Sequence, residues 1–166
     1  MYWNLSYRSD PSGRRLADRH YNRQHVGHHN FVPPGRCLVL VGDGGVSVWV
    51  TSWPKAEYVL HRWAGAWVNS LFRREGGPLA STQILEAVAA TRAVFGDPPP
   101  LGMVTFVDPS KVRHKRDPGR CYLRAGFEPD GQTKSGLVAL RLVPQRMPAP
   151  EPAKGTNETL QMFPAG

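Results

Sequence analysis

The chain has few cysteines and no long apolar run, and each shortage narrows the possible classes of protein. Cys37 and Cys121 are the only cysteines in 166 residues, and this favours reduced thiols over a disulfide framework. No run of eighteen apolar residues occurs, so no transmembrane helix is expected, and the first residues lack the pattern of a signal peptide. We therefore expect a cytoplasmic protein without a membrane partner, with one domain around one core.

Acidic residues are also in short supply. Asp and Glu number 13 against 21 Lys and Arg, which gives a formal net charge of +8. Sixteen of the basic residues are arginines, whose planar guanidinium suits phosphates and base edges. This balance makes DNA a reasonable partner, although an Arg-, Ala-, Gly- and Pro-rich composition typical of a GC-rich genome explains it equally well. The oligomeric state is left open.

The order of local patterns predicts an α/β (α+β) fold. The expected elements are a helix at 9–20, a β-hairpin of strands at 37–41 and 46–52, a strand at 67–73, a helix from about 81 to 95, a buried strand at 101–107, a short helix at 119–124 and a strand at 136–143. Asp10 or Ser12 is expected to cap the first helix, and Ser81 the second, which Gly96 ends. Residues 144–166 are Pro-rich without periodicity, which predicts a disordered tail after a domain at 1–143.

One segment resembles a known family of acyltransferases. Residues 121–127 (Cys-Tyr-Leu-Arg-Ala-Gly-Phe) are similar to the Leu-Tyr-x-x-x-Gly-Phe segment of the GNAT fold. The order of the elements is similar too, so the resemblance implies a mixed central sheet flanked by helices. It further implies that Tyr122 is a general acid toward the leaving thiolate of coenzyme A, and that acetyl-CoA or a related acyl donor is the cofactor.

The loop expected to hold the donor's phosphates departs from the family pattern. GNAT enzymes carry a Gln/Arg-x-x-Gly-x-Gly/Ala loop at a helix N-terminus, where backbone N–H groups bind phosphate. Here the segment 73–81 (Arg-Arg-Glu-Gly-Gly-Pro-Leu-Ala-Ser) has arginines, glycines and a helix start at a different spacing. The candidate cofactor-binding residues are therefore Arg74, Gly76 and Gly77.

Within the GNAT fold, three further segments look like the Mom family of phage DNA-modification proteins. They are residues 19–22 (Arg-His-Tyr-Asn), 71–74 (Leu-Phe-Arg-Arg) and 104–108 (Val-Thr-Phe-Val-Asp). The resemblance implies transfer of a carbamoylmethyl group to the N6 amine of adenine in DNA, and a phage or prophage origin. It suggests a set of catalytic residues that converge at one site: His20, Tyr21, Arg73, Thr105, Asp108 and Tyr122.

Several of these side chains have a simpler structural interpretation. His20 can take a proton from an attacking amine, or can interact with the dipole at the end of a helix. Asp108 can orient His20 or hold a metal, or can cap the turn that follows it. The histidines at 25, 28 and 29 are interpreted as a solvated loop, because no paired cysteine or carboxylate accompanies them. No metal site is predicted.

A dense run of basic residues lies between the buried strand and Tyr122. Placed there, it should border any active site, and it is expected to bind DNA phosphates, which supply most of the affinity for DNA. The candidate nucleic-acid-binding residues are Lys111, Arg113, Lys115, Arg116 and Arg120. A solvated surface loop is the alternative. Two other functions remain open: a conventional N-acetyltransferase acting on a small amine or protein, and a catalytically inactive module that binds nucleic acid.

Overall fold

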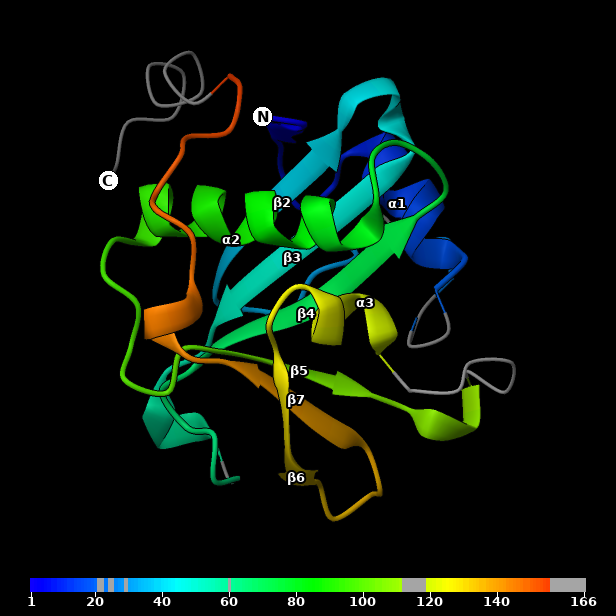
Figure 1. Ribbon diagram of the computed structural model, residues 1–166. Helices are drawn as coiled ribbons and strands as arrows, with labels where there is room; N and C mark the ends of the chain where they lie inside the picture. Colours follow the sequence, from blue (N-terminus) through cyan, green and yellow to red (C-terminus); the bar gives the residue numbers. More distant parts are fainter. Residues whose placement is uncertain (21–22, 24–25, 29, 60, 112–118, 156–166) are drawn as a thin grey trace.

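A seven-stranded sheet runs through the computed structural model, with α-helices on both of its faces (Figure 1). The structure describes residues 1–20, 23, 26–28, 30–59, 61–111 and 119–155. The elements in chain order are β1 (Trp3–Leu5), α1 (Pro11–Asp18), β2 (Arg36–Gly42), β3 (Ser47–Trp53), β4 (Trp67–Arg74), α2 (Ala80–Phe95), β5 (Met103–Val107), α3 (Arg120–Arg124), β6 (Glu128–Gln132) and β7 (Val138–Leu142). The predicted α+β class is confirmed.

The strands are ordered β1-β2-β3-β4-β5-β7-β6. Every neighbouring pair is antiparallel except β4 and β5, which run parallel and are joined through α2. The strand predicted at 101–107 is thus an interior strand of the sheet, between β4 and β7. The hairpin of β2 and β3 also forms as predicted, around a turn at Asp43–Gly45.

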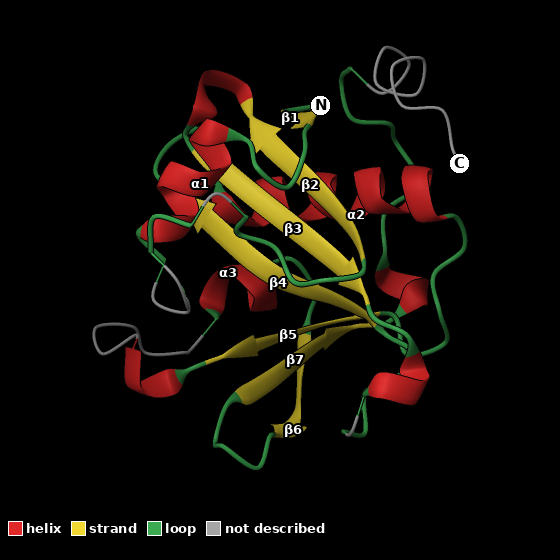
Figure 2. Cartoon of the chain, turned by 180° about the vertical axis from the view of Figure 1, so that it is seen from behind, coloured by secondary structure: helices red, strands yellow, loops and turns green. Residues whose placement is uncertain are grey.

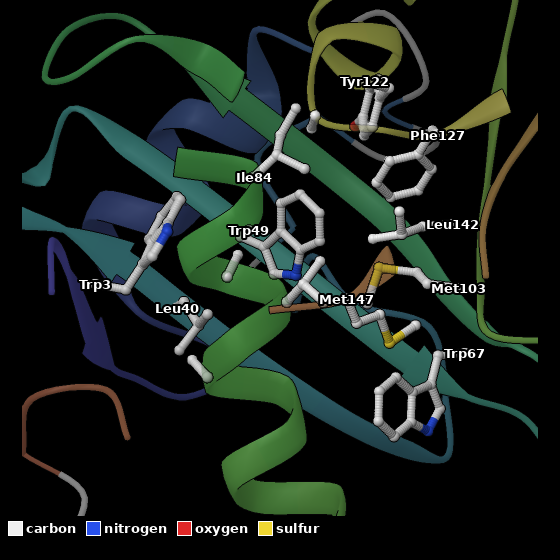
Figure 3. Close-up of a cluster of buried hydrophobic side chains, with 14 of the residues drawn as sticks. Trp3, Leu40, Trp49, Trp67, Ile84, Met103, Tyr122, Phe127, Leu142 and Met147 are labelled. Atoms are coloured by element: carbon white, nitrogen blue, oxygen red, sulfur yellow. The ribbon is translucent and has the colours of Figure 1, made fainter. Parts of the chain in front are cut away.

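Successive side chains of a strand point to opposite faces of the sheet, so each face has its own part of the core. Leu38, Leu40 and Trp49 pack with α2 and α3 on one face, in the cluster of Figure 3. Val39 and Val48 pack on the other face, where they contact α1 through Leu16, Ala17 and their neighbours. Figure 2 shows α1 in front of the sheet and α2 behind it. We call these the α2 face and the α1 face.

The helix ends agree with the sequence at two of three positions. The Asp10 carboxylate accepts a hydrogen bond from the backbone N–H of Gly13 (3.0 Å), so Asp10 caps α1. Gly96, with φ of 84°, follows the last residue of α2 as predicted. The predicted cap at Ser81 is wrong, because α2 already begins at Ala80 and places Ser81 inside its first turn.

A β-bulge interrupts β4. Val50 of β3 pairs with Leu71, but the next residue, Thr51, pairs with Asn69, so Ser70 is one extra residue in β4. The Asn69 side chain holds this irregularity, because its amide nitrogen donates to the backbone oxygens of Val50 (3.1 Å) and Leu71 (2.8 Å).

The segment 144–155 packs against the domain, which corrects the predicted disordered tail and the domain limit at 143. Met147 is 8% exposed and Ala153 is 4% exposed, both within the cluster on the α2 face. The backbone of Lys154 exchanges hydrogen bonds with β1, and its ammonium contacts Asp43. The composition of this segment predicted disorder because it has few apolar side chains. Those few side chains are nevertheless held by contacts with distant parts of the chain. Residues 156–166 lie outside the described part.

A loop between β3 and β4 is fixed to β6 through one carboxylate. Asp130 accepts hydrogen bonds from Trp63 Nε1 (2.8 Å) and Arg141 Nε (3.1 Å), and forms an ion pair with Arg62 (2.8 Å). Partial burial acts to raise the pKa of Asp130, but these hydrogen bonds and the two arginine charges outweigh it and lower the pKa below its ordinary value of 3.8. The ionised carboxylate is therefore stabilised by folding.

We expect Asp130→Asn to lower the free energy of unfolding by about 1–2 kcal/mol at pH 7, since hydrogen bonds to a charged group are lost. A depressed carboxyl pKa stabilises the fold above the unfolded pKa, near 3.8, and this stabilisation is lost as the pH falls through the folded value. The difference in unfolding free energy between wild type and variant, measured by urea unfolding, should therefore be smaller at pH 3 than at pH 7. A difference that is the same at both pH values would contradict this role for Asp130.

Within the described residues, every helix is too short or too polar to cross a bilayer.

Candidate active site

The candidate site lies where the two parallel strands separate. β4 pairs with β5 only from Trp67 to Asn69, opposite Met103 to Thr105, and the remaining residues of the two strands diverge toward their carboxyl ends (Figure 1). Helix α3 lies over this divergence and packs beside α2. Ligands of open α/β sheets bind outside the carboxyl ends of strands, where neighbouring connections lead to opposite sides. The carboxyl ends of β4 and β5, which were predicted to carry catalytic residues, both lie at this end of the sheet.

A buried polar network centred on Asn69 occupies the last pair of residues before the strands part. The Tyr122 hydroxyl donates to Asn69 Oδ1 at 2.5 Å. The Thr105 hydroxyl donates to the backbone oxygen of Asn69 (3.2 Å) and approaches its Oδ1 at 3.3 Å. Asn69 and Thr105 are each 4% exposed and Tyr122 is 9% exposed. The structure therefore brings two of the predicted catalytic residues together, through a third that the sequence did not single out.

The hydrogen-bond pattern fixes which group donates to which. Both N–H bonds of the Asn69 amide are directed at backbone oxygens, those of Val50 and Leu71, so the amide cannot be reversed without placing oxygen against oxygen. Asn69 Oδ1 is consequently an acceptor, and Tyr122 must be the donor. The Tyr122 proton is engaged, and the further hydrogen-bonding capacity of its oxygen is that of an acceptor. A general-acid role for Tyr122 requires this bond to Asn69 to be broken first.

Packing around the Tyr122 ring also positions it. The ring makes edge contacts with Phe72 of β4, at 6.2 Å between centroids, and with Phe127, at 5.3 Å. Figure 3 shows Tyr122 and Phe127 adjacent at the end of the core that α3 covers. The Tyr-x-x-x-x-Phe spacing thus has a local structural reason, since both rings pack against the same end of the α2-face cluster.

Arg73 and the segment of His20 meet on the opposite face of β4. Arg73 pairs with Val48, a residue of the α1-face cluster, and its guanidinium donates to the backbone oxygen of Arg19 (3.2 Å). The His20 N–H donates to Ala17, at the end of α1. The described contacts therefore join the predicted catalytic residues in two groups, one on each face, while Tyr21 lies outside the described residues.

Asp108 has the structural role that was its alternative interpretation. Its carboxylate accepts from the backbone N–H of Ser110 (2.9 Å) and from the Ser110 hydroxyl (2.6 Å), which closes the turn at Pro109–Lys111. These two hydrogen bonds, aided by the charge of Lys111, hold the pKa of Asp108 below its ordinary value despite opposing desolvation.

The turn between β4 and α2 is held by side chains rather than left open. Arg74 donates to the backbone oxygens of Gly77 (3.0 Å) and Pro78 (2.8 Å), and from the other side Gln83 Nε2 donates to those of Gly76 (2.9 Å) and Pro78 (2.9 Å). A side chain at position 77, where φ is +84°, would lie 2.5 Å from the Tyr2 hydroxyl. Arg74 and Gly77, predicted to bind a cofactor, thus shape the turn.

The N-cap residue of α2, Leu79, makes no side-chain capping hydrogen bond among the described residues, and the first turn of the helix contains no acidic residue. Of the predicted nucleic-acid-binding residues, Lys111 and Arg120 are exposed, whereas Arg113, Lys115 and Arg116 lie outside the described residues. In the described part of the chain, no group of three or more His, Cys, Asp or Glu side chains is placed to hold a metal ion.

Comparison of the chain with protein-family models, with curated proteins and with solved structures gives no match. The site is therefore interpreted from its own geometry. Asn69 is the residue that the sequence analysis missed. The signal was present, because strand alternation puts a polar Asn on the same side as Trp67, toward the core.

Proposed function

We propose that the protein is a GNAT-like transferase that modifies the exocyclic amine of adenine in DNA. The observation that carries this proposal is the parallel pair β4 and β5, which pairs over three residues and then separates, beside an uncapped helix N-terminus. The backbone N–H groups of the helix N-terminus can bind the phosphates of a donor. The separation of the two strands gives a place where a second substrate can meet that donor.

DNA is favoured over a small amine by the charge of the surroundings. Arg19 and Arg73, at the carboxyl end of β4, have side chains that are 54% and 37% exposed, and Lys111 and Arg120 are exposed at the end of β5 and the start of α3. The chain as a whole carries +8. Phosphate contacts by such residues supply affinity for DNA regardless of its sequence, whereas a small amine gains nothing from them.

Mass spectrometry of nucleosides tests this proposal directly. DNA from bacteria that express the protein is expected to contain a deoxyadenosine of increased mass, absent from cells that carry the empty vector. Cells that express Tyr122→Phe provide the matched control, since this change removes one hydroxyl and keeps the ring contacts with Phe72 and Phe127. Unmodified deoxyadenosine in cells with folded wild-type protein would contradict the proposed reaction. Acetylation of small amines by the purified protein without DNA would favour the conventional acetyltransferase instead.

A further inference from the structure

A cluster of two arginines and one glutamate lies on the α1 face, outside the carboxyl end of β4. Glu75 Oε1 accepts from Arg19 Nη1 at 2.5 Å, and Glu75 Oε2 accepts from Arg73 Nε at 3.4 Å. Arg73 also donates to the backbone oxygen of Arg19, which joins the end of β4 to the end of α1. One carboxylate is thus shared between two cations that come from separate elements, the end of α1 and the end of β4.

The surroundings of this cluster are positively charged beyond the two arginines. Arg15 lies one helical turn before Arg19 and donates to the backbone oxygen of Gly45, next to Val46, whose own oxygen accepts the N–H of Glu75. The acidic residue closest in sequence on α1, Asp18, is engaged by Arg23. Among the described residues, Glu75 is the carboxylate that pairs with Arg19 and Arg73.

The two arginines have more hydrogen-bond donors than the one carboxylate between them uses. A guanidinium has five N–H donors in a fixed fork, and in this cluster Glu75 receives one from each arginine. The arginine side chains are more exposed than the Glu75 side chain, at 54% and 37% against 25%. Partial burial opposes ionisation of Glu75, yet the hydrogen bonds and charges of Arg19 and Arg73 lower its pKa, so the carboxylate is anionic at neutral pH.

We propose that Arg19 and Arg73 form a binding site for a backbone phosphate of DNA, and that Glu75 competes with the phosphate for the same two guanidinium groups. This inference rests on the proposed function for its ligand. Binding moves the Glu75 carboxylate away from the arginines and replaces it with a phosphate, whose two non-bridging oxygens accept from both guanidinium groups together. Glu75 thereby limits the affinity for DNA.

The test is a change that removes the competitor and keeps the arginines. Glu75→Gln is expected to tighten binding of a 20-base-pair duplex by about three- to tenfold at low salt, and to steepen the slope of log affinity against log salt by up to about 0.9. The double variant Arg19→Gln/Arg73→Gln is expected to weaken binding, and adding Glu75→Gln to it should then give no gain. Fluorescence anisotropy at several salt concentrations measures both quantities, and circular dichroism verifies that each variant is folded.

Glu128→Gln is the matched control for net charge. Glu128 is paired with Arg146 at 2.9 Å on β6, so this variant also removes one negative charge beside one arginine. An equal gain from Glu128→Gln and Glu75→Gln, or no gain from the latter, would overturn the proposed site. In a second arm, inorganic pyrophosphate at matched ionic strength should displace the duplex. If Glu75→Gln changed the affinity for pyrophosphate but not the affinity for the duplex, DNA would be ruled out as the ligand. Because these are binding measurements, a protein that leaves adenine unmodified but shows the Glu75 effect would refute the transferase and leave the phosphate site standing.

Discussion

Replacing Asn69 by leucine is expected to lower the free energy of unfolding by about 3–5 kcal/mol, because several hydrogen bonds in a buried setting are lost together. The Asn69 amide supplies both donors that satisfy Val50 and Leu71 at the bulge. Its oxygen accepts from Tyr122 and lies within reach of Thr105, so leucine would leave these hydroxyl groups without that acceptor. Urea unfolding followed by tryptophan fluorescence measures the loss.

Tyr122→Phe separates the general role of the network from the contribution of one bond. This variant removes only the hydroxyl that donates to Asn69, and we expect it to cost about 1 kcal/mol. If Asn69→Leu costs no more than Tyr122→Phe, the network does not organise the strand separation. The same Phe variant also reports on chemistry. Retention of adenine modification would make Tyr122 a packing residue, whereas loss of modification with little loss of stability would support its participation in transfer.

Ending the chain after Val143 is expected to cost about 6 kcal/mol of unfolding free energy. Removal of Met147 from the α2-face cluster accounts for about 2 kcal/mol, from the apolar surface it buries. The remainder comes from hydrogen bonds at about 1 kcal/mol each. These are the bonds of Glu151 N to Ala89 O, Lys154 N to Trp3 O, Leu5 N to Lys154 O and Arg92 Nη1 to Pro148 O. Calorimetry should show a lower Tm or a loss of the cooperative transition.

A chain that ends after Gly155 is the appropriate control for this truncation. It keeps every contact described for residues 144–155, so any difference between the two truncated chains is due to that segment alone. If the chain ending at Val143 melted at the same temperature as the chain ending at Gly155, the contacts of Met147 and Lys154 would be of no consequence for stability.

The sequence predicts those elements whose signal is local. Alternation and a Gly-rich turn are sufficient for the hairpin of β2 and β3, and helical periodicity ending at Gly96 is sufficient for most of α2. Strands β1 and β6 were missed for opposite reasons. β1 has three residues, too few for a period to be recognised, and β6 contains Pro129 and Gly131, which are uncommon inside strands. Both form because a neighbouring strand, β2 for β1 and β7 for β6, provides their hydrogen bonds.

The candidate site was predictable as a set of segments but not as an arrangement. Thr105 and Tyr122 were singled out on motif and spacing, and their meeting depends on Asn69, a partner 36 residues from Thr105 and 53 from Tyr122. The competing roles of Asp108 could not be resolved from the sequence, because capping and catalysis use the same carboxylate. The position of Ser110 relative to that carboxylate shows the capping role.

The extra residue at Ser70 puts the two halves of β4 out of phase. Before it, Asn69 belongs to the α2 face, and after it Phe72 does, so Leu71 and Arg73 belong to the α1 face. Deleting Ser70 would keep these assignments, because Asn69 and Leu71 on either side of it already lie on opposite faces. If Ser70 were instead paired as an ordinary residue of the strand, without a bulge, the assignments of the residues after it would be exchanged. In such a strand without the bulge, Arg73 would point to the α2 face, away from Arg19 and Glu75, and Phe72 would leave the ring of Tyr122. One extra residue in one strand thus places the cluster of Arg19, Arg73 and Glu75 on one face and the aromatic support of Tyr122 on the other.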